Sequence, residues 1–113
     1  MEFSYTEPER FALIGLAHRI ACADYEITRP ERELLKGLAR ELGAPTWPKL
    51  LLEYHGAKKR PASVDEMIGI IERPEARDRV YTFLYDLSLV DTLDEEEARL
   101  LNRIAKEWGY GVK

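Results

Sequence analysis

Four times in this sequence, a residue that caps helices stands three positions before a glutamate, directly ahead of an apolar pattern with helical period. The four pairs are Thr6 and Glu9, Thr28 and Glu31, Ser63 and Glu66, and Asp94 and Glu97. In such a capping box the first side chain accepts a bond from a backbone N–H at the helix start, and the glutamate reaches back to the cap residue. Because proline favours the first helical position, Glu7 and Arg29 are alternative caps ahead of Pro8 and Pro30. The repeated signal predicts a helical chain.

Apolar residues at helical spacing extend from each of these starts, and two further starts follow Thr46 and Pro74. No stretch alternates apolar and polar residues between turn signals, so no strand is expected. Gly43, Gly56 and Gly109 stand where helices would end. The sequence predicts an all-α compact bundle of about six helices: Glu7–Ala23, Pro30–Leu42, Trp47–Tyr54, Val64–Ile71, Pro74–Val90 and Glu95–Trp108.

The second and sixth predicted helices resemble each other. At an offset of 66 residues, six of the thirteen positions from Glu31 to Gly43 recur unchanged, and the first and fifth helices align at an offset of 67. Each first helix is followed by an aspartate, Asp24 or Asp91. Any two capped amphipathic helices look partly alike, yet the shared turn favours a repeat. We expect two pseudo-repeated helical hairpins, with the third and fourth helices bridging them.

Length and charge narrow the classes of protein further. The 113 residues suit one domain, residues 1–113. A formal net charge of −4 argues against nucleic-acid binding, which needs a basic face. No apolar run approaches the length of a membrane span, and the first residues do not resemble a secretory signal. One cysteine fits a reducing compartment. We expect a cytoplasmic protein without membrane or nucleic-acid partners.

The two turns between the paired helices carry a recognisable pattern. The first reads Ala23-Asp24-Tyr25-Glu26-Ile27 before a glutamate-rich helix start, and the second reads Val90-Asp91-Thr92-Leu93-Asp94 before Glu95-Glu96-Glu97. At these residues the chain resembles the tellurite-resistance TerB-like family, whose hallmark is a small helical bundle with an Ala-Asp-Gly-x-Ile turn, often present twice. The N-terminal domain of a membrane-anchored DnaJ-like co-chaperone shares that fold group. Here Tyr25 and Thr92 replace the glycine of the motif.

This resemblance implies a non-enzymatic domain of bacterial stress response that acts by protein binding, with an acidic site at its two turns. The candidate ligands of a divalent cation are Asp24, Glu26, Asp91 and Asp94. Turns allow carboxylate oxygens to converge, and Ca²⁺ takes six to eight oxygen ligands. The alternative is structural, because helix starts favour negative charge and aspartate is an ordinary helix cap.

Few residues offer other chemistry. His18 and Cys22 are one helical turn apart and His55 is the other histidine, which is short of the four ligands that structural zinc requires. A cysteine in an apolar helix is expected to be inert. With no phosphate-binding glycine loop and no marked catalytic pair, we expect no enzyme.

Two features suggest a partner surface. Lys58, Lys59 and Arg60 are consecutive in a predicted loop, and Trp47 begins the third helix, with Tyr54 seven residues later. Exposed aromatic residues anchor interfaces. Helical spacing equally favours packing of Trp47 and Tyr54 in the core, and a basic loop is often merely solvated. The alternative function is a metal-free interaction module or a homodimer that uses this surface.

Overall fold

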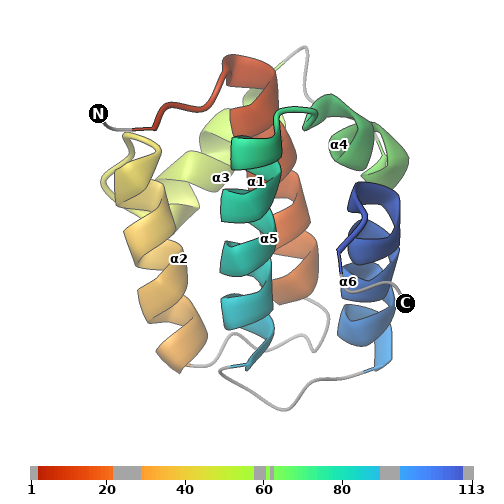
Figure 1. The fold of residues 1–113 in the computed structure, drawn as a ribbon. Helices are drawn as coiled ribbons and strands as arrows, with labels where there is room; N and C mark the ends of the chain where they lie inside the picture. Colours follow the sequence, from red (N-terminus) through yellow and green to blue (C-terminus); the bar gives the residue numbers. More distant parts are fainter. Residues whose placement is uncertain (1–2, 22–28, 58–60, 62, 90–94, 111–113) are drawn as a thin grey trace.

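Each of the six predicted helices is present in the computed structural model, which describes residues 3–21, 29–57, 61, 63–89 and 95–110 (Figure 1). Within these ranges there is no strand, as expected for the all-α class. The helices are α1 (Glu7–Ala21), α2 (Arg29–Glu41), α3 (Trp47–Gly56), α4 (Val64–Ile70), α5 (Pro74–Leu89) and α6 (Glu95–Trp108).

The helix starts follow the predicted capping chemistry where they are described. Thr6 and Glu9 form the complete reciprocal box: the Glu9 N–H donates to Thr6 Oγ1 at 3.3 Å and the Thr6 N–H donates to Glu9 Oε1 at 2.8 Å. Thr6, rather than Glu7, is therefore the cap of α1. Thr46 and Ser63 accept bonds from the N–H groups of Lys49 and Glu66. The Thr28 and Asp94 signals lie outside the described residues.

The glycines at the helix ends adopt two different conformations. Gly43 and Gly109 adopt positive φ values of 90° and 79°, and the N–H groups of the residues after them donate to Ala39 and Ala105. These are Schellman motifs, which satisfy carbonyls at a helix end. Gly56 instead is the last residue of α3, which runs two residues beyond the predicted end at Tyr54. At this end the N–H of Ala57 donates to the Tyr54 carbonyl.

α1 is buried on nearly every side. Its buried residues include Ala12 and Gly15 as well as the larger side chains of Leu13, Ile14 and Leu16. The helix contacts α3, α4 and α5, and α5 lies in front of it in Figure 1, with α2 and α6 to either side. A helix surrounded in this way needs small or apolar residues all round. The core therefore centres on α1.

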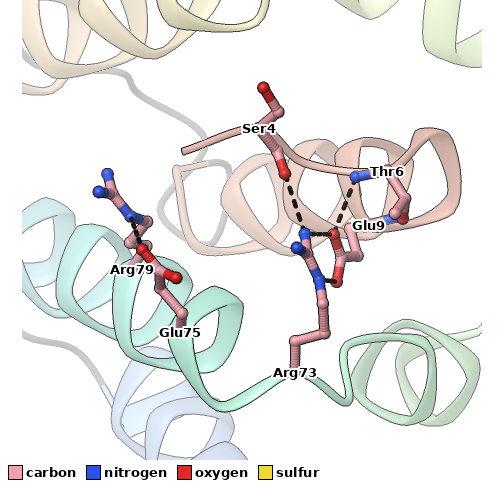
Figure 2. Close-up of polar contacts among 6 residues, drawn as sticks. All are labelled: Ser4, Thr6, Glu9, Arg73, Glu75 and Arg79. Atoms are coloured by element: carbon pink, nitrogen blue, oxygen red, sulfur yellow. Dashed lines mark hydrogen bonds and ion pairs between the residues drawn. The ribbon is translucent and has the colours of Figure 1, made fainter. Parts of the chain in front are cut away.

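One buried carboxylate ties the start of α1 to the start of α5. Glu9 is 4% exposed, and both of its oxygens accept bonds from the Arg73 guanidinium, one of them from Nε at 2.8 Å (Figure 2). Arg73 also donates to the Ser4 carbonyl at 2.9 Å. The Arg73 guanidinium beside Glu9 holds the pKa of that carboxyl below its usual value, despite its burial. The capping glutamate thus also fixes a contact between distant segments.

Three other side chains donate to carbonyl groups at helix ends. Arg10 on α1 donates to the Leu42 carbonyl at 3.1 Å, Arg77 on α5 to Ile71 at 2.8 Å, and the Trp108 indole on α6 to Ile68 at 3.2 Å. The last turn of a helix leaves four carbonyl groups without partners in the helix. These bonds satisfy such groups and connect one helix to the end of another.

α2 and α6 share features at both their starts and their ends, as the predicted repeat requires. The two Schellman motifs are 66 residues apart, as are two buried glutamates, Glu31 and Glu97, each 3% exposed. A relation between whole hairpins would also involve the turns at 22–28 and 90–94, which lie outside the described residues. The repeat stays a prediction.

We expect Glu9→Gln to lower the free energy of unfolding by about 1–2 kcal/mol at neutral pH, because a charge-assisted bond to Arg73 is lost while the amide can still cap the helix. The pKa of Glu9 is lowered in the folded state, so its contribution is present above the unfolded pKa of 4.5 and fades as pH falls through the folded value. Urea unfolding at neutral pH and at about pH 3 measures both effects.

The control for this experiment is Glu72→Gln, which removes an exposed carboxylate one residue before Arg73. Equal stability of Glu9→Gln and the wild type at neutral pH would contradict the assigned role of the ion pair. A destabilisation by Glu9→Gln of the same size at acidic pH would show that the contribution of Glu9 does not depend on its charge.

Two helical glycines are expected to respond in opposite ways to substitution. A Cβ on Gly15 would lie 2.6 Å from Met67 Cε and 2.7 Å from Tyr54 Oη, whereas a Cβ on Gly37 would meet no atom within 4 Å. We expect Gly15→Val to destabilise by about 1–3 kcal/mol through overpacking. Gly37→Ala should stabilise by about 0.5–1 kcal/mol through helix propensity. Thermal unfolding measures both, and the same sign for the two changes would refute this packing.

Candidate functional site

An open groove runs between α2 and α5, which lie side by side in Figure 1. Its volume is about 510 Å³. We call it the α2/α5 groove. The residues that line it are Tyr5, Leu38, Glu41, Glu75, Asp78, Arg79, Thr82, Phe83 and Asp86.

The floor of the α2/α5 groove is apolar because it is made by the inner edges of both helices. Leu38 of α2 is 2% exposed and belongs to the core. Phe83 of α5 is partly buried and packs against the same core. Tyr5, in the segment before α1, closes one part of the lining. A side chain that entered the groove would meet carbon surface at its base.

The rim of the groove is acidic. Four of the lining residues are carboxylates and only Arg79 is a cation. Arg79 lies 3.8 Å from Glu75, one turn away, in an exposed ion pair of the kind that contributes little stability (Figure 2). Asp78 accepts a hydrogen bond from the Tyr110 hydroxyl. Net negative charge over an apolar floor suits a cationic, amphipathic ligand.

The pKa of Tyr5 responds both to burial and to this negative charge. Burial and the nearby Glu41 carboxylate raise its pKa to about 12, and Arg79 offsets only part of that rise. Both causes disfavour a phenolate, because the ionised form is desolvated and repelled. The hydroxyl of Tyr5 is therefore held in its neutral form in the groove.

The acidic face of α5 continues into exposed apolar surface. Glu75, Asp78, Thr82 and Asp86 recur at helical spacing. Tyr85 and Leu89 follow Asp78 and Thr82 by seven residues, about two turns along the same face. They are 48% and 58% exposed, and the third large exposed hydrophobic residue among those described is Leu52 on α3. One helix face thus offers both charge and apolar contact area.

The two histidines meet, although they are 37 residues apart in the sequence. The ring centres of His18 on α1 and His55 on α3 are 5.8 Å apart, with the planes at 82°. Burial, followed by the charges of His55 and Arg19, lowers the pKa of His18. Sequence spacing drew attention to His18 with Cys22, but Cys22 lies outside the described residues.

The acidic turns lie outside the described residues, and with them Asp24, Glu26, Asp91 and Asp94. A cation at these turns stays a prediction. In the described part of the chain, no group of three or more His, Cys, Asp and Glu side chains is placed to hold a metal ion. Lys58, Lys59 and Arg60 also lie outside the described residues.

Of the predicted partner-surface residues, Trp47 and Tyr54 are described. Trp47 is 7% exposed and Tyr54 is 6% exposed, and both belong to the core. This burial fits the core-packing alternative and leaves Trp47 little surface with which to anchor a partner.

The α2/α5 groove was missed by sequence reasoning. The acidic stripe of α5 is readable as a polar face at helical spacing, but such faces are usually solvated. Only the placement of α2 beside it, with Leu38 at the base, makes a groove. Spacing along one helix carries no information about which other helix lies next to it.

Comparison with known proteins identifies no relative: no family model, no curated protein and no solved structure matches the chain. The TerB-like assignment therefore stays a prediction that rests on the two turns. Among the described residues, no helix has the length and apolar character needed to cross a lipid bilayer.

Tyrosine ionisation tests the charge of the groove. Of the six tyrosines, Tyr5 and Tyr110 have pKa values raised to about 12. We expect Tyr5→Phe to remove one late-ionising component from the ultraviolet titration, read immediately after a rapid pH jump. Glu41→Gln should move that component to lower pH because it removes a repulsive charge. Since the raised pKa favours the neutral phenol in the folded state, stability from Tyr5 is present below pH 10 and lost towards pH 12.

Glu33→Gln is the control, because Glu33 is exposed on α2 but does not line the groove. It should leave the late component in place. If Tyr5→Phe instead removes a tyrosine that ionises near the usual pKa of 10, the groove does not perturb the Tyr5 hydroxyl.

Proposed function

We propose that this chain is a non-enzymatic helical domain that acts by binding a partner protein, which presents a basic amphipathic segment to the α2/α5 groove. On the TerB-like resemblance, we further propose a cytoplasmic role in bacterial stress response related to tellurite resistance. The observation that carries the binding proposal is the acidic rim over an apolar floor, formed by Leu38 and Phe83.

The shape of this face supports a peptide rather than a small molecule. Ligand pockets bury most of the surface of a small molecule. The α2/α5 groove is open to solvent, and the exposed Tyr85 and Leu89 add apolar area on α5. A helix or extended segment with apolar residues on one side would cover the floor and these two side chains together. Its flanking lysines or arginines would face the carboxylates.

The charge of the face also bears on self-association. In a twofold dimer the same patch meets its own copy. Two acidic grooves placed against each other would bring Glu41, Asp86 and their copies together, and like charges at an interface oppose binding. This favours a different, basic partner over a homodimer formed through the groove.

A pair of synthetic peptides tests the proposal. Both carry leucines at helical spacing, and their remaining positions are lysine in one and glutamate in the other. We expect the lysine peptide to bind and to shift the NMR signals of Leu38, Phe83 and Leu89. The double variant Glu41→Lys/Asp86→Lys should weaken binding by roughly tenfold or more, and added salt should weaken it further.

The matched control is Glu33→Lys/Glu107→Lys, which makes the same change in net charge at two exposed sites outside the groove. It should retain most of the affinity. Equal loss in both double variants would indicate attraction to net charge alone, and equal binding of the glutamate peptide would contradict the proposal. Doubling of the molecular mass at higher protein concentration, abolished by Glu41→Lys/Asp86→Lys, would favour the homodimer instead.

A further inference from the structure

The contact between α1 and α3 includes the two histidines of the chain. Phe11, Gly15 and His18 recur on α1 at spacings of four and three residues, so they share one helix face. That face meets α3: the Phe11 and Tyr54 rings are 6.1 Å apart, and Gly15 lies against the Tyr54 hydroxyl. His18 and His55 are the next pair along this contact, with ring centres 5.8 Å apart.

Packing on either side fixes the backbone positions that carry the two imidazoles. The α1 residues Ala17 and Ile20, which flank His18 and Arg19, are buried at 0% and 1% exposure, so the backbone that carries His18 is held in the core. His55 follows directly after the buried Tyr54, whose ring lies edge-on to it at 5.4 Å. His18 is partly exposed and His55 is exposed. The pair is therefore held in place by packed neighbours, yet water and ions can reach it.

The spacing of the rings suits coordination of one ion by both. A tetrahedral zinc ion holds each imidazole nitrogen at about 2.1 Å, which puts the centres of two bound rings roughly 5 Å apart. The observed ring centres are 5.8 Å apart with their planes edge to face at 82°, so the imidazoles turn about their side-chain bonds to point one nitrogen each at a shared ion. Each imidazole has two ring nitrogens, so coordination through one leaves the other for a neighbouring group, as is usual in metal-bound histidine.

We propose that His18 and His55 together bind a divalent transition-metal ion of the zinc class, with water or an external ligand in the remaining positions. Imidazole is a good ligand for zinc, nickel and copper, whereas calcium requires many oxygen ligands. This selectivity separates the proposed site from a calcium site at the acidic turns. The histidine site lies on α1 and α3, so the proposal does not depend on the α2/α5 groove.

Zinc titration of the full chain, followed by calorimetry and by the NMR signals of the imidazole rings, tests the site. We expect one zinc ion per chain with shifts at both histidines, and no such shifts with calcium. His18→Gln and His55→Gln should each weaken binding by roughly tenfold or more, because chelation by two linked ligands is lost. The thermal midpoint of the wild type should rise with zinc, since the ion binds only the folded arrangement.

The control is Lys36→Gln, a surface change on α2 that should leave zinc binding unaltered. Cys22→Ser should also leave it largely unaltered if the two imidazoles are the ligands. Circular dichroism of His18→Gln and His55→Gln checks that both remain folded. Absence of zinc binding, or binding that survives both histidine changes and is lost in Cys22→Ser or Asp24→Asn/Asp91→Asn, would overturn the proposal.

Discussion

The burial of α1 is the constraint on which the rest of the structure depends. Its side chains at Leu13, Ile14 and Leu16 are fully removed from water, and α3, α4 and α5 are the helices that cover them. Burying such side chains is the main favourable contribution to folding. Gly15 allows Tyr54 and Met67 to approach the helix closely. The positions of α3 and α4, and of the side chains they carry, follow from this packing.

Burial of a helix also requires that its polar ends be satisfied. Thr6 and Glu9 bond the first N–H groups of α1, and the carboxylate that does so also receives the Arg73 guanidinium. Buried polar groups without partners would cost free energy. Arg10 and Arg77 similarly bond carbonyls after α2 and α4. Exposed pairs within one helix, such as Arg99 with Glu95, contribute much less. Several charged residues thus support the fold by bonding backbone groups at helix ends.

The remaining charge and aromatic surface is where function can be sought. α5 has its buried face on the core, with Val80 and Leu84, and its exposed face carries the carboxylates of the groove. One helix can do both because its apolar and acidic residues recur with the same period on opposite sides. The histidine pair lies where the α1 face that packs on α3 carries a partly exposed residue, His18.

Helix positions were predictable because capping and periodicity are local. Helix starts are marked by the caps Thr6, Thr46 and Ser63, and helix ends by Gly43 and Gly109. The bonds involved span only a few residues. Gly56 also marks a helix end, but as the last residue of α3 rather than as a residue after it, since glycine can also adopt the helical conformation. The complete burial of Ala12 could not be predicted from helical periodicity, because the number of helices that pack around α1 is not a local property.

The sequence by itself determined the all-α class, the order of the six helices and the capping of those starts that are described. Only the tertiary structure decided that Leu38 and Phe83 lie at the base of one acidic groove, that Trp47 is buried, and that His18 meets His55. The physical reason is the range of the interactions. Backbone hydrogen bonds and caps join neighbours in sequence, whereas side-chain packing selects among many ways of placing finished helices against one another.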